Sequence, residues 1–191
     1  MARDRKFSTE ELFQVTQSLL LEHGYEGFTF SILAEHLNVS RGTLYKYYEN
    51  REELIADFML YEMGQFLAEV KEIESIEGFE RKFDFLLSLM FKNQKLHKLI
   101  EIGQHVRADV NEKVRENIAQ LEKLHVQMYH SMEGFIKSGR QEGILKPELP
   151  DSLILGYIFQ SVSIPNHFGI PHDKWVAAIK DIIATGMLRN I

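Results

Sequence analysis

A short stretch near the N-terminus, residues 38–54, gathers side chains that can bind an anionic backbone. Arg41, Lys46 and Arg51 bring three positive charges, and tyrosines stand among them at positions 45 and 47. Guanidinium and ammonium groups donate hydrogen bonds to phosphate oxygens and neutralise phosphate charge. Between residues 38 and 51 only Glu49 opposes the three cations, so the local charge is +2 in a chain of net charge −6. The stretch predicts a local nucleic-acid site on an otherwise acidic protein.

The sequence around this stretch predicts several helices, which would position those side chains. Four residues can cap the N-termini of successive helices: Ser8, Thr29, Ser40 and Asn50. Gly24 ends the first helix, and Asn38 can take the left-handed conformation that ends the second. The fourth helix is expected to run to about Ile73. Only about three residues connect the second and third helices, which predicts a helix-turn-helix rather than an antiparallel pair.

In a helix-turn-helix the second helix enters the DNA major groove, so the side chains of residues 40–51 divide by chemistry. We expect Arg41 and Thr43 to reach base edges, and Lys46 to hold a phosphate. Gly42 costs helix stability, about 1 kcal/mol relative to alanine, which indicates close backbone approach to DNA or to the neighbouring helix. Thr29, Tyr47 and Arg51 are also expected to hold phosphates. The predicted DNA-contacting set is Thr29, Ser40, Arg41, Gly42, Thr43, Tyr45, Lys46, Tyr47 and Arg51. The extreme N-terminus, MARDRK, adds three cations against Asp4.

The remainder of the chain has helical periodicity and almost no strand signal. Helices are expected at about 79–92, 95–106, 110–141, 151–164 and 173–189. The sequence therefore predicts an all-α fold of about nine helices. We expect a helix-turn-helix DNA-binding domain over residues 1–55 and a larger helical ligand-binding and dimerisation domain over residues 56–191.

Other kinds of chemistry have little support in the residue types. The chain has no cysteine, and its histidines lack the i, i+4 spacing of a helical zinc site, so no metal and no cofactor are expected. Phosphate-binding glycine loops, nucleophile elbows and paired-carboxylate motifs are missing, which argues against an enzyme. The charged N-terminus is unlike a signal peptide and the apolar runs are too short to span a bilayer. We expect a cytoplasmic protein.

The stretch GFTFSILAEHLNVSRGTLYKYYENREEL resembles the tetracycline-repressor (TetR) family of bacterial transcriptional regulators. The matching residues are Gly27, Thr29, Ile32, Ala34, Leu37, Val39, Ser40, Gly42, Leu44, Tyr45, Tyr47, Tyr48 and Leu54. The chain departs from the common pattern by aromatic residues at both 47 and 48, and by arginine in place of lysine at 51. The resemblance implies an all-helical homodimer that binds a palindromic DNA operator through its first three helices. It implies a ligand site in the remainder and a dimer interface on the last two helices.

Residues of the middle helices, most of them apolar, are the candidates for a ligand site. The predicted set is Met90, Phe91, Ile100, Gln104, His125, Met128, Tyr129, Met132 and Phe159. It indicates a mainly apolar small molecule, since no buried acidic pair marks a cation and no arginine cluster marks a phosphate. Two functions stay open. One is a repressor released from its operator by such a molecule; the other is a DNA-binding protein whose C-terminal domain binds a protein partner. A large cavity among residues 80–165 would favour the first, and a filled core with an exposed apolar patch the second.

Overall fold

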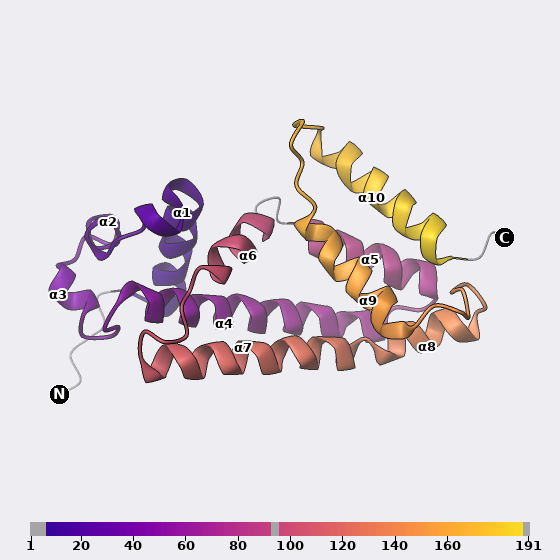
Figure 1. Cartoon of the computed structure of the whole chain (residues 1–191), viewed down its shortest axis with the longest axis horizontal. Helices are drawn as coiled ribbons and strands as arrows, with labels where there is room; N and C mark the ends of the chain where they lie inside the picture. The colour runs from indigo at the N-terminus through magenta and orange to yellow at the C-terminus, as the bar shows by residue number, and fades with distance from the viewer. Residues whose placement is uncertain (1–6, 93–95, 189–191) are drawn as a thin grey trace. The chain divides into compact units, whose positions relative to one another are not determined.

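The computed structural model describes residues 7–92 and 96–188, which fold almost entirely into helices (Figure 1). The α-helices are α1 Thr9–Gly27, α2 Phe30–His36, α3 Arg41–Leu44, α4 Arg51–Val70, α5 Phe79–Phe91, α6 Leu96–Gln104, α7 Glu112–Ser131, α8 Glu133–Gln141, α9 Asp151–Gln160 and α10 His172–Met187. Two 3-10 helices, η1 Lys71–Ser75 and η2 Ser161–Ser163, extend α4 and α9. Over these residues β-structure is limited to one isolated bridge between Leu145 and Leu188. The predicted all-α class is confirmed.

The long helix expected over residues 110–141 is interrupted at Met132. Its backbone there has φ −93° and ψ 1°, outside the α-helical range. The Met132 N–H donates to the carbonyl of Tyr129, three residues back, while the Ser131 hydroxyl donates to the carbonyl of Met128 at 2.7 Å. This local tightening divides the segment into α7 and α8. Counted as one broken helix, the two bring the total over the described residues to the nine expected.

One compact unit comprises Met1–Met63 and Lys98–Glu122, apart from the undescribed N-terminal residues 1–6. The first three helices and the start of α4 share a single apolar core in this unit. Its fully buried members include Leu12, Leu20, Phe28, Leu33, Leu44, Leu54 and Phe58. Leu99 and Ile102 of α6 join the same core. The helix-turn-helix is therefore held by side chains from both ends of the unit's sequence.

The helix caps predicted for this unit are present. Ser8 accepts a hydrogen bond from the Glu11 N–H at 2.9 Å, and the Asn50 side chain accepts from the Glu53 N–H at 2.8 Å. Gly24 interrupts α1 with φ 68°, a left-handed conformation that costs glycine little. The last residues of α1 consequently turn away from its axis and lead into α2.

The second compact unit comprises Gly64–His97 and Lys123–Ile191 as far as these residues are described. Aromatic stacking fixes α5 against α8, with the rings of Phe79 and Phe135 centred 4.8 Å apart. A Cβ at Gly139 would lie 2.6 Å from the Phe79 ring, so glycine permits this close packing. The carboxylate of Glu142 accepts hydrogen bonds from the Phe79 N–H at 3.0 and 3.1 Å, which satisfies the N-terminus of α5.

Helices α4 and α7 each contribute residues to both units. The functional division at residue 55 stays a prediction. Among the described helices, none combines the length and the apolar character needed to cross a membrane.

Candidate nucleic-acid interface

Helices α2 and α3 form the predicted helix-turn-helix. The turn between them is made by residues 37–40, where Asn38 has φ 51°, the left-handed conformation expected of it. The N–H groups of Leu37 and Val39 donate to the carbonyls of Leu33 and Ala34 at 3.0 and 2.9 Å. The turn therefore supplies hydrogen-bond donors to backbone carbonyls at the end of α2. This leaves α3 free to point its N-terminal residues outward.

Side-chain caps define the start of each helix in this motif. Thr29 Oγ1 accepts from the Ile32 N–H at 3.3 Å, and Ser40 Oγ accepts from the Thr43 N–H at 3.2 Å. Ser40 Oγ also lies 3.0 Å from Thr43 Oγ1. The hydroxyls of Ser40 and Thr43 therefore support one another, and either of them can still present a lone pair or a proton outward.

Residues 41–47 are here called the recognition segment. Its helical part, Arg41–Leu44, is one turn long, and residues 45–47 continue it as hydrogen-bonded turns. Of the predicted DNA-contacting residues, most are exposed: Thr29, Ser40, Arg41, Gly42, Tyr45, Lys46 and Tyr47. Thr43 and Arg51 are half-buried, whereas Leu44 and Tyr48 face the core. The outward and inward faces of this segment agree with the pattern read from the sequence.

Two tyrosines of the recognition segment rest on aromatic residues that the sequence did not mark as part of the site. The Tyr45 ring packs edge-on against Phe30, with centroids 5.1 Å apart, although Tyr45 is 56% exposed. Tyr47 packs against Phe7 at 5.7 Å. Burying one edge of each ring fixes the direction of its hydroxyl. Phe7 and Phe30 thus support the interface without facing solvent, and only their place as apolar residues beside a cap could have indicated this.

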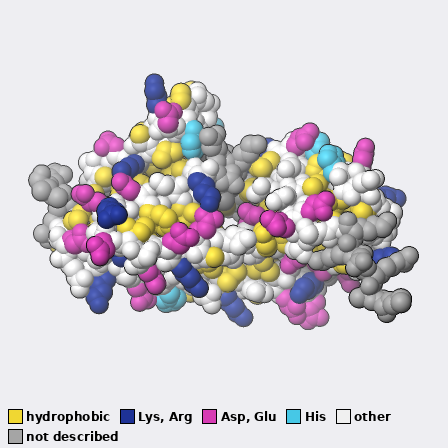
Figure 2. All heavy atoms as spheres, turned by 180° about the vertical axis from the view of Figure 1, so that it is seen from behind, with side chains coloured by type: hydrophobic (Ala, Val, Ile, Leu, Met, Phe, Trp, Pro, Cys, Tyr) yellow, Lys and Arg dark blue, Asp and Glu magenta, His cyan; other side chains and the backbone are white. Residues whose placement is uncertain are grey.

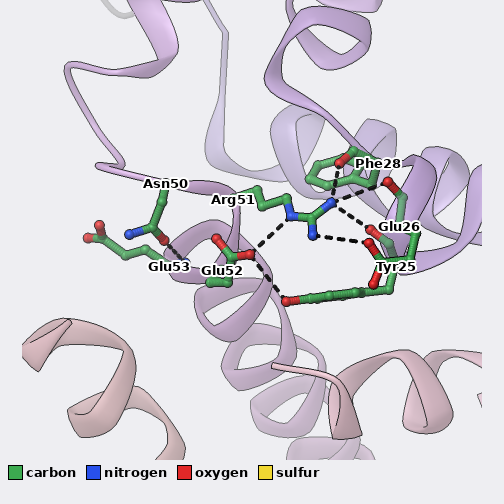
Figure 3. Close-up of polar contacts among 7 residues, drawn as sticks. All are labelled: Tyr25, Glu26, Phe28, Asn50, Arg51, Glu52 and Glu53. Atoms are coloured by element: carbon green, nitrogen blue, oxygen red, sulfur yellow. Dashed lines mark hydrogen bonds and ion pairs between the residues drawn. The ribbon is translucent and has the colours of Figure 1, made fainter. Parts of the chain in front are cut away.

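Arg51, which was expected to hold a phosphate, directs its guanidinium toward the end of α1 (Figure 3). Its Nη1 donates to the carbonyls of Tyr25, Glu26 and Phe28 at 3.0, 3.3 and 3.2 Å. Its Nε donates to the Glu52 carboxylate at 3.0 Å, and its guanidinium carbon lies 4.6 Å from the centre of the Tyr25 ring. The Tyr25 hydroxyl donates to the same Glu52 oxygen at 3.2 Å.

The positive charge of Arg51 is balanced within this cluster by the Glu52 carboxylate. Partial burial would raise the pKa of the Glu52 carboxyl, but hydrogen bonds and attraction from Arg51 outweigh it and hold that pKa below its ordinary value. Burial, followed by the charge of Glu52, raises the pKa of the Tyr25 hydroxyl. Arg51 therefore adds little free positive charge to the outer surface. The exposed cations of the described recognition segment are Arg41 and Lys46.

The predicted ligand residues divide between the two units. In the second unit Met90, Phe91, Met128, Met132 and Phe159 are buried. Tyr129 joins α7 to α9, since its ring lies 5.4 Å from that of Phe159. His125 is exposed and lies 5.6 Å from Tyr129, ring to ring. Ile100 and Gln104 belong to the first unit and are exposed. Over the described residues, no three histidine or carboxylate side chains are grouped as metal ligands.

The fold and the outward recognition segment define a helix-turn-helix DNA-binding regulator. Residues 12–58 match the bacterial regulatory proteins of the tetR family. The chain is 24% identical over 154 residues to the fatty acid metabolism regulator protein of Bacillus subtilis, which covers 80% of this chain and 78% of that protein. It is also 24% identical over 110 residues to an HTH-type transcriptional regulator of Staphylococcus aureus, covering 55% of this chain and 60% of that protein.

Solved structures share the fold over nearly the whole chain. The ketosteroid transcriptional regulator KstR2 of Mycobacterium tuberculosis superposes with a TM-score of 0.70 at 16% identity, covering 100% of this chain and 98% of that one. The regulator FadR of Bacillus subtilis in complex with stearoyl-CoA gives 0.68 at 22% identity, covering 94% and 99%. The resemblance to the TetR family is therefore confirmed over residues 12–58, while the solved structures show that the chain shares their fold.

Proposed function

We propose that this regulator is a homodimeric repressor that leaves a palindromic operator when a mainly apolar small molecule binds its C-terminal helices. One observation carries the effector part of the proposal. Similarity to the fatty acid metabolism regulator extends over 154 residues, far beyond the helix-turn-helix match at residues 12–58. A relative that shared only DNA binding would give a shorter alignment.

The residue types of α5, α7 and α9 support an apolar effector. Met90, Met128 and Met132 have flexible thioether side chains that adapt to irregular apolar groups. Phe91 directly follows Met90 in α5, and Phe159 of α9 adds a second buried aromatic ring. A long acyl group, such as that of the stearoyl-CoA bound by the related FadR, has the matching chemistry. Because the sequence offers no arginine cluster for phosphates, we propose that the acyl part rather than the CoA part is recognised.

Apolar side chains exposed on the last helices support the dimer. They lie on α9, on the segment after it and on α10: Leu153, Tyr157, Ile164, Phe168, Ile170 and Ile182. Phe168 is 93% exposed. Figure 2 shows that hydrophobic side chains also reach the surface among charged ones on the face turned away from the viewer in Figure 1. Apolar side chains exposed in this number are costly in water, and we propose that a second copy of the chain covers them.

The test begins with selection of a duplex from random DNA by the full-length protein. The affinity for that duplex is then measured with stearoyl-CoA, free stearate and CoA added separately. We expect both acyl compounds to weaken DNA binding and CoA alone to have no effect. By linkage, the operator must weaken acyl binding by the same factor, since the coupling free energy is reciprocal.

Three results would change the proposal. Failure to select any duplex would remove specific DNA binding. Release by CoA alone would move recognition from the acyl chain to the nucleotide. If no acyl compound affects a specifically bound duplex, the exposed apolar side chains of the last helices favour the other function considered from the sequence, a C-terminal domain that binds a protein partner.

A further inference from the structure

Arg51 closes the helix-turn-helix at its base. The chain enters the motif directly after Phe28 and leaves it directly before Arg51, and the Arg51 Nη1 group reaches the Phe28 carbonyl at 3.2 Å. The same nitrogen reaches the carbonyls of Tyr25 and Glu26, which belong to the end of α1. A single guanidinium therefore joins the start of α4 to the end of α1 across residues 29–50.

These hydrogen bonds use most of the donors that arginine has. The guanidinium carries five N–H hydrogens, one on Nε and two on each Nη. Nε and Nη1, with three of these hydrogens, face protein acceptors. Nη2 lies 3.6 Å from the Glu26 carboxylate, and the Arg51 side chain is only 26% exposed. An incoming phosphate would have to compete with these protein acceptors for the same hydrogens.

The surroundings suit arginine and not lysine. The Tyr25 ring lies under the planar guanidinium at 4.6 Å and stacks with the His105 ring at 5.6 Å. The Glu52 oxygen accepts from both Arg51 and Tyr25. A lysine ammonium is a compact point charge without a planar fork, so it cannot serve several carbonyls, a carboxylate and a ring face together.

We propose that Arg51 is a positioning residue of the DNA-binding site, and that the cluster of Tyr25, Glu26, Phe28, Arg51 and Glu52, here called the Arg51 clasp, holds the recognition segment in place. Arg51 acts on DNA through the geometry of the motif and not through a phosphate. The DNA part of this inference rests on the proposed function; the clasp itself can be tested without DNA.

The experiment compares Arg51→Lys, Arg51→Met and Lys46→Met with the unaltered protein. Thermal unfolding is measured without DNA, and affinity for the selected duplex is measured over a range of salt concentrations. Each phosphate that the protein binds contributes about 0.9 to the slope of log affinity against log salt. We expect both Arg51 variants to unfold at lower temperature and to bind the duplex more weakly with an unchanged slope. Lys46→Met should unfold like the unaltered protein and show a shallower slope.

The opposite pattern would overturn the clasp. In that pattern, Arg51→Lys would keep the DNA affinity and the unfolding temperature of the unaltered protein. Arg51→Met would unfold at the same temperature but show a shallower salt slope. Together these results would assign Arg51 to a phosphate contact. An Arg51→Met chain that no longer folds supports the clasp, because a side chain that only touches phosphate is not needed without DNA. If the unaltered protein selects no duplex, the proposed function fails, while the unfolding temperatures still decide whether the clasp exists.

Discussion

The hydroxyl of Tyr48 donates a 2.7 Å hydrogen bond to Oδ2 of Asp57. Tyr48 is the last buried residue before α4, and Asp57 lies nearly two turns into that helix. The bond ties the end of the recognition segment to the helix that follows it. Together with the Arg51 clasp, it fixes the exit of the chain from the helix-turn-helix.

Removal of that hydroxyl is expected to destabilise the protein. Tyr48→Phe keeps the buried ring but loses a hydrogen bond to a carboxylate, which costs about 1.5–3 kcal/mol. For a chain of this size the melting temperature falls by about 2–4 °C for each kcal/mol. Tyr45→Phe removes the same atom from an exposed ring and is the matched control for thermal unfolding. Equal losses in the two variants would contradict the role given to the Tyr48–Asp57 bond.

Gly42 should matter for DNA and not for folding. A Cβ built at Gly42 meets only Ser40 Oγ, at 3.8 Å, an ordinary van der Waals distance. Because no neighbouring helix requires glycine there, close approach to DNA remains as the explanation. Gly42→Ala should raise stability by up to about 1 kcal/mol, since alanine favours helix, and should weaken duplex binding.

The control for Gly42 is Gly134→Ala. Gly134 lies in α8, and a Cβ there meets no atom within 4 Å. Gly134→Ala should gain stability without any change in DNA affinity. For both variants, stability is measured by thermal unfolding and affinity on the selected duplex. Unaltered duplex binding by Gly42→Ala would remove the close approach inferred for this residue.

Arg41 and Lys46 should contribute differently to sequence preference. Arg41 is exposed at the start of α3, and its Nη1 lies 3.4 Å from Ser31 Oγ, at the limit of a hydrogen bond. Arg41→Ala should narrow the difference in affinity between the selected duplex and random DNA. Lys46→Ala should weaken both alike and lower the salt slope by about 0.9 for each phosphate that it no longer binds. Both affinities are measured by fluorescence anisotropy; a uniform decrease for Arg41→Ala would contradict base readout.

Glu52 should make the free energy of unfolding depend on pH. Its pKa in the folded protein lies below the ordinary value of 4.5. The unfolded chain therefore binds a proton more readily, so the stabilisation is present above pH 4.5 and is lost as pH falls through the folded pKa. In urea unfolding from pH 7 downward, Glu52→Gln should lose less stability on acidification than the unaltered protein. Parallel curves for the two proteins would show that Glu52 carries no such linkage.

A second copy of the chain should dissociate when the exposed face of α9 is made charged. Leu153 of α9 and Val126 of α7 are both 56% exposed. The unaltered protein should sediment at twice the chain mass of 22.3 kDa. Leu153→Asp should shift it toward the single-chain mass, whereas Val126→Asp should not. A single-chain mass for the unaltered protein would reject the proposed dimer.

Local interactions explain why the helix-turn-helix could be predicted. A cap joins a side chain to an N–H three residues ahead, as for Ser40 with Thr43, so residue type and spacing are enough to indicate it. The left-handed Asn38 follows from its short polar side chain for the same reason. The all-α class also followed from periodicity, because a helix buries one face whatever it packs against.

The long-range contacts could not be predicted in this way. Nothing in the spacing of residues 38–54 shows that Arg51 reaches the carbonyls of Tyr25 and Phe28. An arginine in a basic stretch has the same residue type whether it points to solvent or to the protein. Likewise, the packing of Tyr47 on Phe7 joins residues about forty positions apart in the chain.

The sequence by itself therefore determined the class of fold, the helix-turn-helix and its outward face. The tertiary structure decided which cation is withdrawn from that face and where the long helix breaks. The physical reason is the range of the interactions. Caps and periodicity act within a few residues, whereas the direction of a long polar side chain depends on acceptors that only the folded chain brings within about 3 Å.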